Sequence, residues 1–520
     1  MPTMSLYMGK EHCSFSFEAP ALISQELQER GVGFALPCGG NRTCKKCRVT
    51  AYGELSPLSL EEREAFSPAE LEQNLRLACC TVALGDCTVV LPKGTSFFAD
   101  TFEELPSVGD ASPFGSQGVA AAVDIGTTTI AVYLVDLTDS HIIARLGEEN
   151  QQKCFGADVI SRIACAQEKP GPLQKTVCSQ LDRMIGLLLA QTNIPKQAVK
   201  GMAITGNTTM LHLLCGLDAS GIAAAPFVPQ SLFGVMYSAR ELFRSLPASC
   251  PVYLCPCVSA YAGADLVCAA LSCKMEENSL VVDIGTNGEM ALFREGRLLC
   301  AAAAAGPAFE GAGLSMGMPA KNGAVKEVSY QDGRLSYQVV GAGPAQGICG
   351  TGAVDALAFL LEQGALDETG LLLEEGHPFS PLIRKTKEDT AFLLGDSGVM
   401  ITQRDIRQLQ LAKAAIAAGI DTLLYRGGCQ PQDITSVYIA GGFGSWLNPY
   451  TAGKIGLLPP SLIDRCQSVG NAAGAGACLC ALSETFLVQA QTLAQTAQEV
   501  SLSQDPYFME QYIHRMLFYA

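Results

Sequence analysis

The segment Ala122–Asp136 reads AVDIGTTTIAVYLVD and predicts a buried strand, a tight turn and a second strand. The first strand ends at Asp124, and the turn passes through Gly126. Glycine and small hydroxyl residues in such a turn leave backbone N–H groups able to hold phosphate oxygens. Asp124 stands where a Mg2+ ion bridging those phosphates would bind. The hydroxyl residues of the turn are Thr127, Thr128 and Thr129.

The same pattern returns in the segment Leu280–Phe293, LVVDIGTNGEMALF. Its aspartate, Asp283, comes 159 residues after Asp124 (283 − 124 = 159). A single copy is equally compatible with an ordinary hairpin, but two copies in matching settings favour a duplicated nucleotide cleft. The second turn contributes Gly285, Thr286, Asn287, Gly288 and Glu289 as expected nucleotide contacts.

Three further turns are expected to contact the nucleotide. Asn207 follows a predicted strand in ITGNTTM, and it either contacts ligand or simply caps the next helix. Glu310 is an acid within the neutral, glycine-rich stretch Ala301–Met318, so we expect it to face the nucleotide. In the stretch IAGGFG, two glycines would let an adenine ring lie against the backbone. The residues of this last motif are Gly441, Gly442 and Phe443.

The N-terminal region carries a cysteine pattern typical of an iron–sulfur site. A loop reads CGGNRTCKKC, and a further cysteine follows 32 residues after the third (79 − 47 = 32). Three thiolates on one tight loop and one remote thiolate suit a 2Fe–2S cluster of the plant ferredoxin type, although that type has four residues where this loop has five. The predicted ligands are Cys38, Cys44, Cys47 and Cys79.

Zinc is the competing interpretation of these cysteines, but the paired CxxC motifs usual for zinc are missing. Cys80 and Cys87 are interpreted as additional thiols that are not ligands. Most of the 22 cysteines are scattered in alanine-rich surroundings and are predicted to pack as small apolar residues. Such frequent use of cysteine fits an anaerobic host.

Composition excludes several classes of function. The chain has 520 residues, 51 acidic against 35 basic residues and no basic run, so we expect no nucleic-acid partner. Neither a signal peptide nor an apolar stretch of about twenty residues is found, which predicts a cytoplasmic protein without a membrane partner.

The chain is predicted to have an α/β fold in several domains. We place a cysteine-bearing domain at 1–94 and, from its acidic, Pro-, Gly- and Ser-rich composition, a linker at 95–118. The duplicated region then divides into a first part at 119–200 and a main part at 201–520. We expect the aromatic C-terminal segment Phe508–Tyr519 to dock on the core.

The motifs DIGTTT, DIGTNGE and IAGGFG resemble the phosphate-1, phosphate-2 and adenosine motifs of the actin/sugar-kinase/heat-shock-chaperone superfamily. More narrowly, CGGNRTCKKC, FGADVISRI, AAAGPAFEGA and GICGTGAVDA resemble the reductive activators of corrinoid proteins. This second resemblance covers nearly the whole chain. It implies a duplicated ribonuclease-H-like ATPase core behind an N-terminal β-grasp, ferredoxin-like domain. One departure is Cys80, which stands where a polar residue is expected.

The resemblance implies a function as well. An ATP-hydrolysing reductase would pass an electron from a 2Fe–2S cluster to an inactive Co(II) corrinoid protein and restore Co(I) for methyl transfer. ATP, Mg2+ and the cluster would be its cofactors, with Asp124, Asp283 and Glu310 as catalytic residues. A low-potential electron donor, which the sequence does not identify, and a second copy of the chain are the other expected partners, with 119–200 as a possible dimer region.

Other functions share parts of this pattern. A small-molecule kinase would use the same ATP-binding core with Glu310 or Asp265 as base, but it would not explain the cysteine-bearing domain. A flavin- or nicotinamide-dependent ferredoxin reductase lacks its GxGxxG turn here. An actin-like scaffold has no use for a redox centre. Another ATP-gated iron–sulfur donor, of the 4Fe–4S type, would not require a plant-type cysteine loop.

Overall fold

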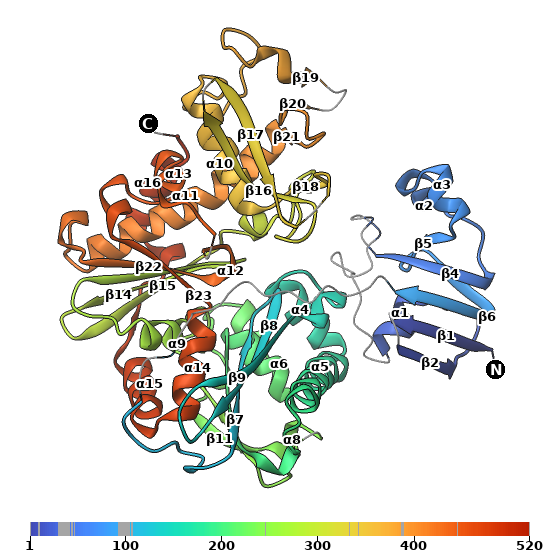
Figure 1. Ribbon diagram of the computed structural model, residues 1–520, viewed down its shortest axis with the longest axis vertical. Helices are drawn as coiled ribbons and strands as arrows, with labels where there is room; N and C mark the ends of the chain where they lie inside the picture. Colours follow the sequence, from blue (N-terminus) through green and yellow to red (C-terminus); the bar gives the residue numbers. More distant parts are fainter. Residues whose placement is uncertain are drawn as a thin grey trace. The chain divides into compact units, whose positions relative to one another are not determined.

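The computed structural model describes residues 2–8, 11–29, 42, 45, 47–91, 105, 108–244, 246–331, 333–341, 343–385, 389–444 and 446–518. Two compact units are distinguished: residues 1–98 with 110–255, and residues 99–109 with 256–520 (Figure 1). Cys38, Cys44 and most of the predicted linker at 95–118 lie outside the described residues. In the part of the chain that is described, no helix is both long and apolar enough to cross a bilayer.

The N-terminal region forms one sheet with the strand order β2-β1-β6-β4-β5, and β3 pairs with β6. Along β6, alternate side chains are buried, as a strand with one covered face requires. β1 and β6 run parallel, and the other neighbours run antiparallel. The strands are β1 (Thr3–Met8), β2 (Glu11–Ser16), β3 (Ala21–Leu22), β4 (Arg48–Leu55), β5 (Leu75–Leu77) and β6 (Val82–Leu91).

Three short helices accompany this sheet: α1 (Ile23–Glu29), α2 (Leu60–Ala65) and α3 (Pro68–Glu72). Serine caps α2 and α3 in reciprocal capping boxes, with Ser59 paired to Glu62 in the first. Glu62 is fully buried and bonds to Arg76, at 2.7 Å from Oε1 to Nε and 3.2 Å from Oε2 to Nη2. The same carboxylate accepts the Leu77 N–H at 3.1 Å and the Thr81 hydroxyl at 2.9 Å. Glu62 therefore ties α2 to the turn that follows β5.

The rest of the first unit is built on a sheet of order β11-β12-β10-β7-β8-β9. Helix α5 packs on β8 and β9, and α4 and α6 pack against α5 (Figure 1). The strands are β7 (Val119–Ile125), β8 (Thr129–Asp136), β9 (Ile142–Glu149), β10 (Val199–Gly206), β11 (Val235–Ser238) and β12 (Pro251–Leu254). The helices are α4 (Val159–Glu168), α5 (Pro170–Thr192), α6 (Thr208–Cys215), α7 (Ser220–Ala223) and α8 (Ala239–Leu242).

Two boundaries predicted from sequence fall within this sheet region. The predicted division at residue 200 lies inside β10, which pairs with β7 along its length. At the end of the predicted linker, Phe114 is buried and packs against Gly201, where a Cβ atom would come within 2.1 Å of its ring. Any freely flexible part of the predicted linker therefore ends before Phe114.

The second unit repeats five strands of the six-stranded sheet of the first unit, while the edge strands β11 and β24 differ. Its order is β23-β22-β13-β14-β15-β24, so that β13 has an antiparallel partner in β14 and a parallel one in β22. In the first unit β7 is flanked in the same way by β8 and β10. The strands are β13 (Ser279–Ile284), β14 (Gly288–Arg294), β15 (Arg297–Ala303), β22 (Ser436–Ala440), β23 (Cys466–Gly470) and β24 (Gln498–Glu499). The duplication expected from the two DIGT segments is thus present in the topology.

Helices and two small sheets complete the second unit. Helix α11 packs on β14 and β15, while α14 and α9 pack so closely that a Cβ on Gly476 would lie 2.1 Å from the Cys268 carbonyl oxygen. The helices are α9 (Ala264–Ser272), α10 (Gly350–Glu362), α11 (Gln403–Arg426), α12 (Gly441–Gly444), α13 (Pro449–Lys454), α14 (Ala472–Leu482), α15 (Glu484–Thr496) and α16 (Pro506–His514). The small sheets are β16 (Ala324–Gln331), β17 (Arg334–Val339) and β18 (Gly347–Ile348), and β19 (Ile383–Lys385), β20 (Thr390–Leu393) and β21 (Met400–Thr402).

The C-terminal segment docks on α11, as expected. Lys413 is buried on α11, and its Nζ donates to the Leu517 carbonyl at 2.6 Å and lies 4.8 Å from the centre of the Phe518 ring. Arg515 also forms a bidentate ion pair with Asp421. The cysteines of α9 and α14 are packed as predicted, since Cys268, Cys478 and Cys480 are fully buried.

The buried ion pair in the N-terminal region should dominate local stability. We expect Glu62→Gln to leave the Arg76 charge buried and unpaired, at a cost of about 3–5 kcal/mol. Hydrogen-exchange mass spectrometry of residues 75–81 should show faster exchange, because the Leu77 amide bonds directly to Glu62.

Glu64→Gln is the matched control on the same helix, because Glu64 pairs with Lys45 at the surface. Its effect should stay below about 1 kcal/mol. Equal exchange rates in the two variants would contradict the role given to Glu62.

Candidate functional site

The first aspartate turn joins β7 to β8 as predicted. Asp124 is aligned with Ala131 of β8 on one side and with Thr205 of β10 on the other. The Gly126 N–H donates to the Thr129 carbonyl at 2.9 Å, and a Cβ atom on Gly126 would lie 2.7 Å from that oxygen. Only glycine fits this turn without displacing the backbone.

Buried polar side chains fix the carbonyl groups of this turn. Asn150 donates from Nδ2 to the Gly126 carbonyl at 2.8 Å, and its N–H bonds to the Thr128 carbonyl at 2.7 Å. Arg162, fully buried on α4, donates from Nη2 to the Thr127 carbonyl at 2.7 Å. Three successive carbonyls are therefore bound, and a guanidinium charge lies against the turn, where it favours anionic ligands.

Asn207 joins this turn from the end of β10. Its Oδ1 accepts the Met210 N–H at 3.0 Å and so caps α6. Its Nδ2 donates to the Thr127 hydroxyl at 3.0 Å. The capping role that the sequence left open is therefore confirmed, and the contact with Thr127 places Asn207 beside the predicted phosphate residues.

The second aspartate turn joins β13 to β14 in the second unit. Asp283 is aligned with Glu289 of β14 and with Ala440 of β22. Gly441 follows directly with a φ of +87°, and a Cβ atom there would lie 2.5 Å from the Asp283 Oδ1. The phosphate-2 and adenosine segments, far apart in sequence, are thus adjacent.

Glu310 belongs to the same neighbourhood. It ends the short 3-10 helix η3 (Pro307–Glu310), and both of its carboxylate oxygens lie 3.2 Å from the Thr286 hydroxyl. On the neighbouring residue of η3, the Phe309 ring stacks on Phe443 with centroids 5.0 Å apart. Predicted residues from three segments of the second unit therefore come together.

The acids of this neighbourhood perturb one another. Burial, Asp265 and Glu310 together raise the pKa of the Asp283 carboxyl to about 7. Asp265 lies in the first turn of α9, with its Oδ1 bonded to the Leu266 N–H at 2.9 Å. A divalent cation would relieve this repulsion by binding the ionised forms.

Of the four predicted cluster ligands, Cys47 and Cys79 are described, and they lie together. Both are buried, and their Sγ atoms are 3.2 Å apart. The Cys79 N–H also donates to the Cys47 sulfur at 3.5 Å. Contact with Cys47 and burial both raise the pKa of the Cys79 thiol.

This pair suits a metal–sulfur centre. Two thiolates on one tetrahedral metal with bonds of about 2.3 Å lie about 3.8 Å apart, somewhat farther than the 3.2 Å between the Cys47 and Cys79 sulfurs. A backbone N–H directed at a ligand sulfur is a usual feature of such centres. Cys38 and Cys44 lie outside the described residues, so their position in the ligand set stays a prediction.

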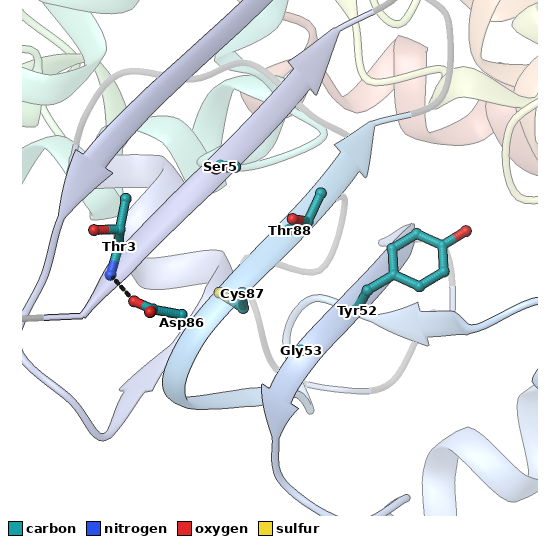
Figure 2. Close-up of a pocket in the computed structure, with 7 residues that line it drawn as sticks. All are labelled: Thr3, Ser5, Tyr52, Gly53, Asp86, Cys87 and Thr88. Carbon is teal, nitrogen blue, oxygen red and sulfur yellow. Dashed lines mark hydrogen bonds between the residues drawn. The ribbon is translucent and has the colours of Figure 1, made fainter.

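Two further cysteines lie in the same sheet region. Cys80 is buried next to Cys79, with the two sulfur atoms 3.7 Å apart. Cys87, in the middle of β6, instead lines a hollow of about 360 Å3 with Tyr52, Asp86 and Thr88, as Figure 2 shows. The two thiols interpreted as additional therefore have different surroundings.

Sequence reasoning missed the supporting residues Asn150, Arg162 and Glu62. A signal existed for Arg162, because it is a charged residue on the apolar side of a short helix, in the segment VISRIACA. A capping box marked Glu62, but its bonds to Arg76 and Thr81 depend on the tertiary fold.

Comparisons with known proteins match most of the chain to one family. Residues 277–520 match the family described as the C-terminal domain of RACo, the ASKHA domain, and residues 119–278 match the RACo middle region. A corrinoid activation enzyme, RamQ of Eubacterium limosum, is 32% identical over 96% of each chain. A [Co(II) methylated amine-specific corrinoid protein] reductase of Methanosarcina barkeri is 28% identical over 65% of each.

A solved structure extends the likeness to three dimensions. The reductive activator for corrinoid, iron–sulfur protein matches with a TM-score of 0.69 and 27% identity, covering 100% of this chain and 98% of that one. The fold class expected from the sequence is confirmed, including its duplicated ATPase core.

The cysteine site predicts the colour and metal content of the protein. Purified without air, it should be red-brown with about two irons and two sulfides per chain. Serine in place of Cys38, Cys44, Cys47 or Cys79 should lower iron content, whereas Cys87→Ser should not. A colourless protein with one bound zinc would refute the assignment.

The raised pKa of Asp283 predicts a pH dependence. Below about pH 7 this carboxyl is protonated and competes poorly for metal, so Mg-ATP turnover should rise as pH increases through 7. Asp265→Asn removes a neighbouring negative charge, lowers the pKa of Asp283 and should move the midpoint to lower pH. ATPase assays from about pH 5.5 to about pH 9 measure the rise in turnover and the shift of its midpoint in Asp265→Asn.

Asp139→Asn is the control, because this exposed acid of the β8–β9 turn lies in the first unit. We expect Asp139→Asn to leave the pH profile of ATPase activity unchanged. If Asp265→Asn also leaves the midpoint of that profile unchanged, the carboxyl of Asp283 does not set the midpoint.

Proposed function

The chain belongs to the RACo family of reductive activators of corrinoid proteins, and on that premise we propose how it works. It uses ATP to drive an electron from a 2Fe–2S cluster, held by Cys38, Cys44, Cys47 and Cys79, to an inactive Co(II) corrinoid protein. Reduction restores the Co(I) form that accepts methyl groups. A bound cluster would supply one electron at a time.

The observation that carries this proposal is the presence of two kinds of site in one chain. A buried pair of thiols lies in the N-terminal sheet, and two aspartate turns of matching topology lie in the later sheets. A small-molecule kinase would explain only the turns and is not favoured, since a relative matched over 96% of the chain is named for corrinoid activation.

The nucleotide roles follow from the geometry of each turn. We assign Asp124 to Mg2+ and the N–H groups of the first turn to phosphate. In the second unit, Asp283 would hold a divalent cation and Glu310 would orient a water molecule for hydrolysis. Gly441 and Gly442 would accept the adenosine without a side chain in the way.

ATP can drive the uphill electron transfer only if the affinity of the activator for its corrinoid partner differs between nucleotide states. The state with ATP bound must favour the complex with the Co(II) partner, and the state after hydrolysis must favour its release. Because such coupling is reciprocal for binding, the Co(II) partner should also change ATP affinity. We propose that an external low-potential donor, not identified by the structure, then reduces the cluster again, and that the activator works as a homodimer.

Replacement of either aspartate tests the nucleotide assignment. Asp124→Ala and Asp283→Ala should each lower Mg-ATP turnover about a hundredfold or more, because loss of a metal-binding carboxylate costs several kcal/mol in the transition state. The visible spectrum of the cluster should not change, since the cysteines lie in another sheet. Asp139→Ala is the exposed control.

Binding can be separated from turnover in the same proteins. Trp446 is the only tryptophan of the chain, is half-exposed and follows Phe443 by three residues, so its fluorescence should report nucleotide at the adenosine motif. Full ATPase activity in both aspartate variants would contradict the assignment whatever the fluorescence shows.

The predicted linker gives a separate test of electron delivery. Deletion within residues 95–108, short of the anchored Phe114, should leave cluster content and basal ATPase activity intact. Reduction of the corrinoid partner should stop, because a shortened tether cannot bring the cluster to the cobalt. An unchanged rate of cobalt reduction would exclude movement of the N-terminal domain.

A further inference from the structure

Cys80 has a place in the structure that the proposed function does not use. It follows the ligand Cys79 in the turn between β5 and β6, and only 7% of it is exposed. Its sulfur lies 3.7 Å from the Cys79 sulfur, within hydrogen-bonding distance for sulfur atoms. We propose that the Cys80 thiol donates a hydrogen bond to the Cys79 ligand and thereby sets the reduction potential of the cluster.

The direction of this bond follows from the chemistry of the ligand. In the pair of free thiols either sulfur can be the donor. A cysteine that ligates a metal does so as a thiolate, without a proton. Once Cys79 holds iron, only Cys80 retains an S–H group, so Cys80 must donate and Cys79 must accept. This step rests on the cluster assignment made under the proposed function.

The surrounding structure holds the donor in position. The Cys80 N–H bonds to the Leu77 carbonyl at 2.8 Å, and the Leu77 N–H bonds to the buried Glu62 carboxylate. The Thr81 N–H bonds to the same Leu77 carbonyl at 3.0 Å, and the Thr81 hydroxyl donates to Glu62 at 2.9 Å. Both ends of the turn are therefore fixed by groups that do not depend on the metal.

A hydrogen bond to a ligand sulfur changes the energy of the reduced cluster. Reduction adds negative charge to the cluster and its ligands, and a donor stabilises that charge. The Cys80 thiol therefore raises the reduction potential. A higher potential makes the cluster easier for its donor to reduce and leaves a larger part of the uphill transfer to cobalt to be driven by ATP.

Substitutions at Cys80 test this role in the full-length, cluster-loaded protein. Cys80→Ala and Cys80→Val remove the donor, and valine also fills the buried space. Cys80→Ser keeps a donor. Cys87→Ala is the control, because Cys87 is a buried thiol of the same sheet that lines the hollow on β6.

Two quantities are measured on each protein: iron and sulfide content, and the reduction potential from a titration followed by electron paramagnetic resonance. We expect full iron content in all four variants. The potential should fall in Cys80→Ala and Cys80→Val, while Cys80→Ser and Cys87→Ala should stay near the unmodified protein.

Two results would overturn the proposal. A full cluster with an unchanged potential in Cys80→Ala or Cys80→Val would show that the thiol does not tune it. Loss of iron in every Cys80 variant, with Cys87→Ala intact, would make Cys80 a ligand instead. If the unmodified protein holds no iron–sulfur cluster, the proposed function itself fails, which is a distinguishable outcome.

Discussion

The structure depends on a strand that carries an aspartate as its second-last residue. This strand is paired on both sides, antiparallel to the next strand and parallel to a distant one. β7 and β13 both satisfy this constraint. It brings the end of a remote strand next to each aspartate, so closely that Gly441 has no room for a Cβ atom beside Asp283. Two sheets result in which five corresponding strands follow the same order, β12-β10-β7-β8-β9 and β23-β22-β13-β14-β15, and each places an acid near the end of β7 or β13.

In the N-terminal region, one buried carboxylate, that of Glu62, holds the turn that carries Cys79 and Cys80. Glu62 has no exposed surface, yet its pKa is lowered, because bonds from Arg76, Ser59 and Leu77 outweigh the cost of burial. The same bonds fix the turn that carries Cys79 and Cys80. The cysteine pair and the first aspartate turn thus rest on separate networks of hydrogen bonds.

Local sequence was sufficient for features that depend on local geometry. The glycines of both aspartate turns, the Asn207 cap and the duplication are visible in the residues themselves. Arg162 and Asn150 could not be predicted, because their bonds to the first turn join segments that are separate in sequence. The division at residue 200 fell within β10, since composition does not reveal which strands share a sheet. Cys80 acquires a role only from its 3.7 Å contact in the folded protein.

The central claim is that ATP and an iron–sulfur cluster act together on a corrinoid partner. The most direct measurement follows the Co(II) signal of a corrinoid protein by electron paramagnetic resonance, with reduced activator present and with or without Mg-ATP. The account predicts conversion to Co(I) only when ATP is added, and no conversion with Asp283→Ala. Equal conversion without ATP, or none with it while both cluster and ATPase activity are intact, would contradict the account.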